Sequence, residues 1–159
     1  MNAVYKGGMF YHSGTFPDYS DTTIFHRGNY GFYVIVDQAF FNRSLHAGRG
    51  LCFFTQAGFS PGSFNQIGYY IGAGLRYHGL ISGRFYDEIG LAFATVGLGK
   101  PYKKLYQSPY SNETTIEATY KFKFGKNYSI QPNIQYIINP GTGEYNNCFV
   151  SLIRFTLEY

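Results

Sequence analysis

The sequence predicts an all-β fold, a transmembrane antiparallel β-barrel, on three observations. Polar and apolar residues alternate with period two over several stretches. Aromatic residues make up 21% of the 159 residues and charged residues only 14%, and aromatic rings suit a pleated surface better than a helix. The chain also has 20 glycines and 6 prolines, which suit the turns between many strands. No apolar run approaches the ~20 residues that a transmembrane helix needs, whereas in a barrel only every second residue faces lipid.

The first three expected strands are the least regular. We place them at residues 3–13, 30–41 and 50–59. The next two alternate more clearly, at 67–78 and 86–98. One face of these two strands is mainly aliphatic or aromatic, and the other is rich in glycine: Gly68, Gly72, Gly74 and Gly90.

The clearest strand is residues 114–124. Its charged residues Glu117, Lys121 and Lys123 all fall on one face, whereas helical spacing would scatter them around an axis. A charge facing lipid at mid-depth costs about 2–4 kcal/mol, so this face must look into a water-filled lumen. A strand of about eleven residues tilted by ~40° rises about 28 Å, enough to cross the hydrocarbon.

The last two strands are expected at residues 128–138 and 147–159. Pro132 falls on the apolar side of the first of them, where we expect a bulge or a weakened rung because proline has no N–H to donate. The chain ends on Tyr159 after alternating apolar residues. This ending resembles the signal by which the barrel-assembly machinery recognises outer-membrane proteins.

The connections between these eight strands alternate in character. Residues 14–29 and 99–111 make long polar loops, while Gly125–Asn127 makes a tight turn. Outer-membrane barrels have long external loops and short periplasmic turns. Counting back from a periplasmic C-terminus places both long loops outside and the tight turn inside.

The first residues of the chain do not form a basic segment followed by an apolar one, as an export signal would. A barrel of the outer membrane must be exported. We therefore expect residues 1–159 to be a single domain that forms the C-terminal part of a longer protein.

Several motifs, in order along nearly the whole chain, resemble the carbohydrate-selective porin (OprB) family. They are Gly7–Asp18, Gly31–Tyr33 with Asp37 and Gln38, Gly58–Gly62, Gly72–Leu75 with Gly83 and Arg84, Gln131 with Pro132, and Gln135–Gly141. The resemblance implies a barrel of about sixteen strands in the bacterial outer membrane, open to water, through which sugars and other small solutes diffuse passively. It implies that this chain is about the last half of the barrel, and it assigns no constriction residue to a position here.

A diffusion pore needs a wet wall of hydrogen-bonding and charged groups, with aromatic rings that stack on sugars. Arg76, Lys121 and Lys123 carry the fixed charges that we expect to bias the passage of ions. The full set of expected pore-lining residues is Asp37, Gln56, Arg76, Glu88, Glu117, Lys121, Lys123, Gln131, Asn133, Gln135 and Arg154.

The side chains in the sequence do not indicate an enzyme. The four histidines are scattered, with no nucleophile or carboxylate at a telling spacing. Glu88 and Glu117 are the nearest thing to a glycosidase pair, but we expect them at different depths of the barrel. The sequence indicates no cofactor or metal site, and the short lysine cluster at residues 100–104 is too small to indicate nucleic acid.

The expected partners are small solutes, outer-membrane lipid, the barrel-assembly machinery and, as an open alternative, further copies of the same protein. One rival architecture also stays open. Eight strands closed on themselves would form a small outer-membrane barrel with a structural, anchoring or adhesive role, its interior filled by side chains.

Overall fold

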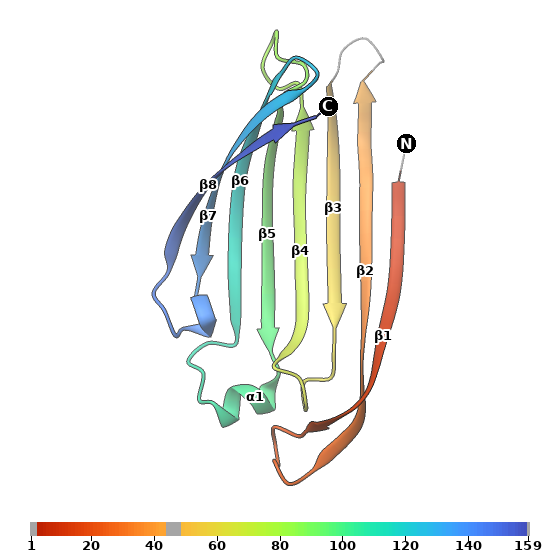
Figure 1. Cartoon of the computed structure of the whole chain (residues 1–159), viewed down its shortest axis with the longest axis vertical. Helices are drawn as coiled ribbons and strands as arrows, with labels where there is room; N and C mark the ends of the chain where they lie inside the picture. The colour runs from red at the N-terminus through yellow and green to blue at the C-terminus, as the bar shows by residue number, and fades with distance from the viewer. Residues whose placement is uncertain (1–2, 44–48, 159) are drawn as a thin grey trace.

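The computed structural model describes residues 3–43 and 49–158. They form one antiparallel sheet of eight strands whose spatial order is their order in the sequence (Figure 1). The strands are β1 (Ala3–Pro17), β2 (Phe25–Arg43), β3 (Arg49–Phe59), β4 (Ile67–His78), β5 (Glu88–Leu98), β6 (Asn112–Phe124), β7 (Tyr128–Ile138) and β8 (Cys148–Leu157). The prediction of an all-β antiparallel sheet with eight strands is confirmed.

The chain runs up and down, so its connections alternate between two ends of the sheet (Figure 1). Connections 18–24, 60–66, 99–111 and 139–147 lie at one end, and 79–87 and 125–127 lie at the other, with the C-terminus. This confirms that the two long loops share an end. Within the described residues β1 and β8 are both edge strands and do not pair with each other, so the sheet is open.

The first long loop is shorter than predicted, because β1 and β2 extend into it. Thr15, Phe16 and Pro17 pair with Arg27, His26 and Phe25 after a register shift. The predicted ends of these strands were therefore wrong, because this polar segment stays paired up to Pro17 and from Phe25 onward. Gly28 has φ +90 and lies under the Tyr11 ring, where a Cβ would meet the hydroxyl oxygen at 2.5 Å. The glycine thus permits the irregularity and the ladder resumes beyond it.

The second long loop contains a short helix that period-two reasoning did not predict. It is α1 (Lys100–Leu105), with Pro101 in its first turn, where the missing N–H is harmless. A 3₁₀ turn, η1 (Pro140–Thr142), follows β7. None of the helical segments in the described part of the chain is long and apolar enough to cross a membrane.

Pro132 weakens one rung, as predicted, and makes no bulge. Its strand β7 keeps one register along β6, but the pairing is interrupted between the Thr119–Asn133 and Phe122–Ile130 pairs. Thr119 compensates by donating its hydroxyl hydrogen to the Pro132 carbonyl oxygen at 3.0 Å. On the other side Pro132 stays paired with Ile153 of β8.

Among the described residues no apolar side chain is fully buried. Large side chains lie exposed on the face opposite the charged residues, with exposed fractions of 57% for Leu91, 64% for Ile153 and 74% for Phe155. An apolar band of this extent is a contact surface for lipid or another apolar partner, not for water.

Candidate channel wall

The strand registers place every one of the predicted pore-lining residues on one face of the sheet. Residues paired across antiparallel strands share a face, and faces alternate along each strand. One row across the sheet therefore joins Asp37, Phe54, Gly74, Ala92, Glu117 and Gln135 in order. The row continues to Val150 of β8. Each of the other predicted residues lies an even number of positions along its own strand from the member of this row on that strand. We call this face the polar face.

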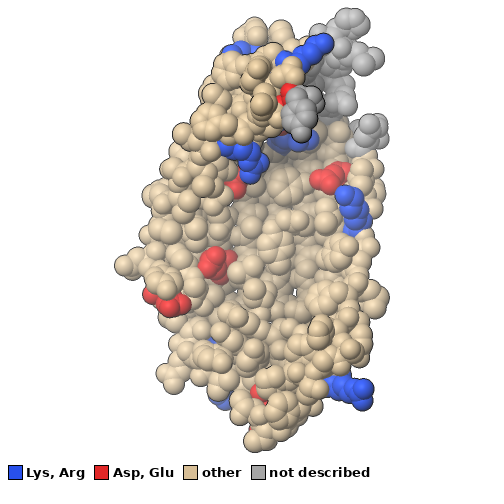
Figure 2. Space-filling view, in the orientation of Figure 1, with Lys and Arg blue, Asp and Glu red and all other residues tan. Residues whose placement is uncertain are grey.

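The polar face is the hollow side of the sheet. Figure 2 shows a hollow between the two edges of the sheet with charged side chains on its walls. Two cavities open along it. One of about 160 Å³ is lined in part by Arg76, Glu88, Lys121 and Gln131. The other, about 340 Å³, lies nearer β8 and is lined by Glu117, Gln131, Asn133, Gln135, Leu152, Ile153 and Arg154.

The charges on the polar face are held by neighbours across the strands. Arg76 Nη1 lies 3.8 Å from Glu88 Oε2. On the other side of Glu88, the residue paired with it on β6 is Lys121. Gln135 Nε2 donates to Glu117 Oε2 at 2.9 Å. These contacts place positive, negative and neutral groups next to one another over a short stretch of the polar face.

The structure does not bring all the predicted residues together. Asp37 and Gln56 lie on β2 and β3, outside the cluster on β4 to β8, and Gln56 Nε2 donates to the Tyr70 hydroxyl oxygen at 2.6 Å. Lys123 is paired instead with Glu158, at 3.9 Å. Glu88 and Glu117 are not opposite each other either, since Glu117 faces Ala92. This agrees with the different depths expected for the two carboxylates.

Four aromatic rings on the polar face were missed. Phe10, Tyr33, Phe54 and Tyr70 lie over Gly31, Gly8, Gly74 and Gly72, where a Cβ would come within 2.4–2.7 Å of their ring or hydroxyl atoms. The period-two alternation could have indicated them, because each of these rings falls on the same face of its strand as the glycines. Phe54 and Tyr70 thus fill the space over Gly74 and Gly72 on the glycine-rich face.

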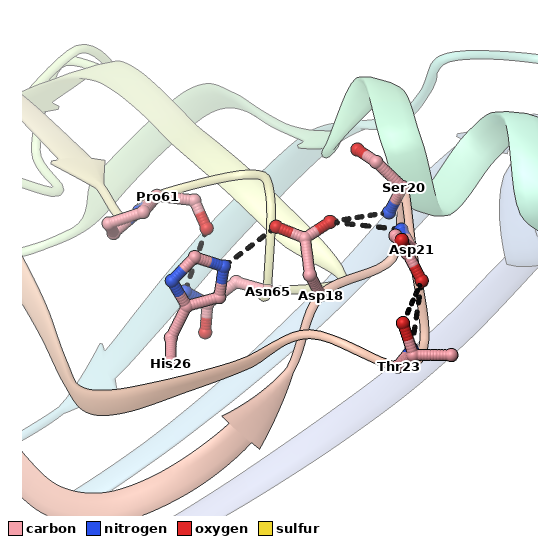
Figure 3. Close-up of polar contacts among 7 residues, drawn as sticks. All are labelled: Asp18, Ser20, Asp21, Thr23, His26, Pro61 and Asn65. Carbon is pink, nitrogen blue, oxygen red and sulfur yellow. Dashed lines mark hydrogen bonds and ion pairs between the residues drawn. The ribbon is translucent and has the colours of Figure 1, made fainter.

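A second set of polar contacts lies at the long-loop end, within the β1–β2 connection with His26 and within connection 60–66 (Figure 3). Asp18 is 8% exposed; its Oδ2 lies 2.7 Å from His26 Nε2, and its Oδ1 accepts from the backbone N–H of Ser20 at 2.6 Å. The hydrogen bond with His26, followed by the one from Ser20, lowers the pKa of Asp18. Asn65 Nδ2 donates to the Pro61 carbonyl oxygen at 2.8 Å. The backbone N–H of Tyr19 donates to the Ser63 carbonyl oxygen at 2.8 Å, which ties the two connections into one rim.

Two further features concern the cysteines and the last residue of the chain. Cys52 and Cys148 are free thiols. Tyr159, the terminal aromatic predicted to be read by the assembly machinery, lies outside the described residues.

A family model described as "Carbohydrate-selective porin, OprB family" matches residues 1–159. The chain is 27% identical to Porin B of Pseudomonas aeruginosa over 143 residues, which cover 79% of this chain and 32% of that protein. A solved structure titled "High pH structure of Pseudomonas putida OprB" superimposes with a TM-score of 0.87 and 22% identity, covering 99% of this chain and 44% of that one. The chain thus spans less than half the length of these relatives.

Proposed function

Because the chain belongs to the carbohydrate-selective porin family, OprB, a family of outer-membrane porins, we propose that it forms part of the wall of a water-filled channel for passive diffusion of sugars and other small solutes. The main support for the proposal is that polar and apolar side chains lie on opposite faces of the sheet. All the predicted pore-lining residues share the hollow polar face, and the opposite face is apolar. A wall of this kind is wet on one side and compatible with lipid on the other.

The open edges support a larger barrel than this chain alone. Within the described residues β1 and β8 each lack a partner on one side, and lipid cannot satisfy unpaired backbone N–H and C=O groups. We infer that further strands of the whole protein pair with both edges, for about sixteen strands in all. Residues 1–159 then act as a single domain of that barrel. The rival closed barrel would pair β1 with β8, and nothing in the sheet favours it.

The proposed partners follow from the same picture. Sugars and small solutes pass through the hollow, and lipid contacts the apolar face. We further propose that the barrel-assembly machinery binds the C-terminal aromatic residue. A homo-oligomer would need an interface on the apolar face. A channel of this kind needs no catalytic residue or cofactor, because diffusion breaks no bond.

The test of the channel is electrical. The full-length porin should give stable open-channel current in a planar bilayer, and added sugars should reduce it. A complete lack of current from folded, inserted protein would refute the channel and favour an anchoring or adhesive barrel.

Replacing Lys121 and Lys123 together by Glu is expected to shift the channel toward cations. Both residues lie on the polar face, Lys121 opposite Glu88 in the strand pairing and Lys123 in an ion pair with Glu158, so the change would place two new carboxylates beside two existing ones. The reversal potential under a salt gradient measures the shift, which should shrink as salt screens the charges. Lys126→Glu, in the turn beyond the strands, is the matched control. An equal shift in the control would remove both lysines from the channel wall.

A further inference from the structure

A third cavity, about 590 Å³, lies at the long-loop end of the sheet, among α1, the start of β6 and the β7–β8 connection. We call it the mouth cavity. Its size falls within the range of small-molecule sites. Its polar and aromatic lining includes Tyr102, Tyr106, Ser108, Glu113, Thr142 and Glu144. None of these belongs to the set of pore-lining residues discussed above.

Aromatic rings form one wall of the mouth cavity. Tyr102 and Tyr106 lie one turn apart at the end of α1, with ring centroids 4.5 Å apart. Tyr19, from the β1–β2 connection, meets the Tyr102 ring edge to face at 4.9 Å. Burial, followed by the neighbouring tyrosines and Glu144, raises the pKa of Tyr102. Tyr106 is 60% exposed, so much of its surface stays available to a ligand while Tyr102 and Tyr19 hold it in place.

The rim described above fixes this wall. The backbone N–H of Tyr19 donates to the Ser63 carbonyl oxygen at 2.8 Å, and the Asp18 carboxylate holds the turn beside it (Figure 3). On the other side the Gly99 N–H donates to the Gln66 carbonyl oxygen at 2.9 Å, where α1 begins. The tyrosine wall is therefore attached at both sides to connection 60–66, a preorganised arrangement that lowers the entropic cost of binding.

Acceptor groups form the other side of the cavity. Glu113 lies on the polar face of β6, paired with Val96, and its Oε2 accepts from the Gly141 N–H at 2.7 Å. A carboxylate offers about four lone-pair sites, so this contact leaves acceptor capacity toward the cavity. Glu144 hydrogen-bonds with Tyr145, which raises the pKa of that tyrosine. The Ser108 hydroxyl can donate as well as accept, and the Thr142 hydroxyl, which donates to the Gly141 carbonyl oxygen at 2.6 Å, can still accept.

Resting on the proposed function, we propose that the mouth cavity is a docking site for a neutral sugar at the entrance of the channel. A pyranose ring has one face of C–H groups and a rim of hydroxyls. Its C–H face stacks on Tyr106, because apolar C–H groups pack against an aromatic face. Its hydroxyls donate to the carboxylates of Glu113 and Glu144. The site concentrates the solute at the mouth before it enters the hollow between the strands.

The test measures sugar-dependent current block of the full-length porin in a planar bilayer, with glucose and maltotriose as probes. Tyr106→Ala is expected to raise the half-blocking sugar concentration about tenfold, since aromatic stacking at an exposed face has about that effect. Tyr106→Phe keeps the ring and should block at nearly the parent concentration. Glu113→Gln should weaken the sugar-dependent block. Without sugar, its open-channel current should differ from that of the parent only by the effect of one lost charge.

Tyr86→Ala is the matched control, because Tyr86 is also an exposed tyrosine, at 76%, but lies in the connection at the opposite end. Equal half-blocking concentrations for Tyr106→Ala and Tyr86→Ala would overturn the docking site while leaving the sugar channel standing. Tighter block by glucosamine than by glucose, lost in Glu113→Gln, would also overturn it and assign the cavity to cations. A parent channel that conducts but ignores every sugar would refute the proposed function itself.

Discussion

Replacing Ile116 by Arg is expected to destabilise the folded porin in phospholipid vesicles by about 2–4 kcal/mol. Ile116 lies in the middle of β6 on the apolar face, flanked by Phe93 and Tyr136 on the neighbouring strands. An arginine there must carry its charge into hydrocarbon or bend toward a headgroup. Reversible urea unfolding of the full-length porin in vesicles measures the loss.

Thr115→Arg is the matched control for this prediction. Thr115 precedes Ile116 and pairs with Ala94 and Ile137 on the polar face. The same charge then enters the hollow, where water solvates it, and the free energy of unfolding should change by less than about 1 kcal/mol. If Thr115→Arg destabilised the protein more than Ile116→Arg, the assignment of the lumen and lipid faces would be reversed.

The two faces were predictable from sequence because the signal is local and repeated. In β6 every charged residue falls at alternate positions, and β7 repeats the pattern with amides. A strand whose polar face is wet and whose other face meets lipid admits only one register, since a slip of one residue exchanges the faces. The sequence of each such strand therefore indicates which of its faces is polar, even when its neighbouring strands are unknown.

The ends of β1 and β2 were not predictable in this way. Phe25, His26 and Arg27 extend β2 beyond Gly28 and pair with β1 across a register shift. Glycine signals both a turn and a bulge in sequence, and only the partner strand decides between them. The helix α1 was missed for a related reason. Six residues are too short for a helical period, and α1 depends on packing of Tyr102 against Tyr19 of a distant connection.

The mouth cavity needed three-dimensional information for the same reason. Its lining comes from strands and connections spread along the sequence, so no motif joins Tyr106 to Glu113 and Glu144. The positions of the rings over the glycines on the polar face needed less three-dimensional information. Tyr33 and Gly8 lie in one row, but that row appears only once the register between the strands is known.

Replacing Asp87 by Ala, at the end of the sheet opposite the mouth cavity, is expected to destabilise the protein about as much as Ile116→Arg. Asp87 is 2% exposed and joins the β4–β5 connection to β6. Its carboxylate accepts from Arg84 Nε and from Arg84 Nη2 at 3.0 Å, from the Tyr120 hydroxyl at 2.9 Å and from the Lys123 backbone N–H at 2.9 Å. The Arg84 guanidinium also lies 5.5 Å from the Phe124 ring centroid.

Removal of the carboxylate leaves these donors without their acceptor, so we expect Asp87→Ala to lower the free energy of unfolding by about 3 kcal/mol. Tyr120→Phe removes one hydrogen bond and should cost about 1 kcal/mol. The double variant should cost less than the sum of the two, because both changes break the same contact. Asp21→Ala is the control, since the Asp21 side chain bonds mainly to Thr23 in its own turn.

The pH dependence separates the charge of Asp87 from its shape. Burial would raise the pKa of this carboxyl, but the hydrogen bonds from Arg84, Lys123 and Tyr120 outweigh it and lower the pKa. A carboxyl with a lowered pKa contributes stability above the unfolded-state pKa, near 3.9, and loses it as the pH falls through the folded-state pKa. The difference in unfolding free energy between the parent and Asp87→Asn should therefore be constant near neutral pH and shrink below about pH 4. A difference that persists unchanged in acid would show that Asp87 acts through packing and not through its charge.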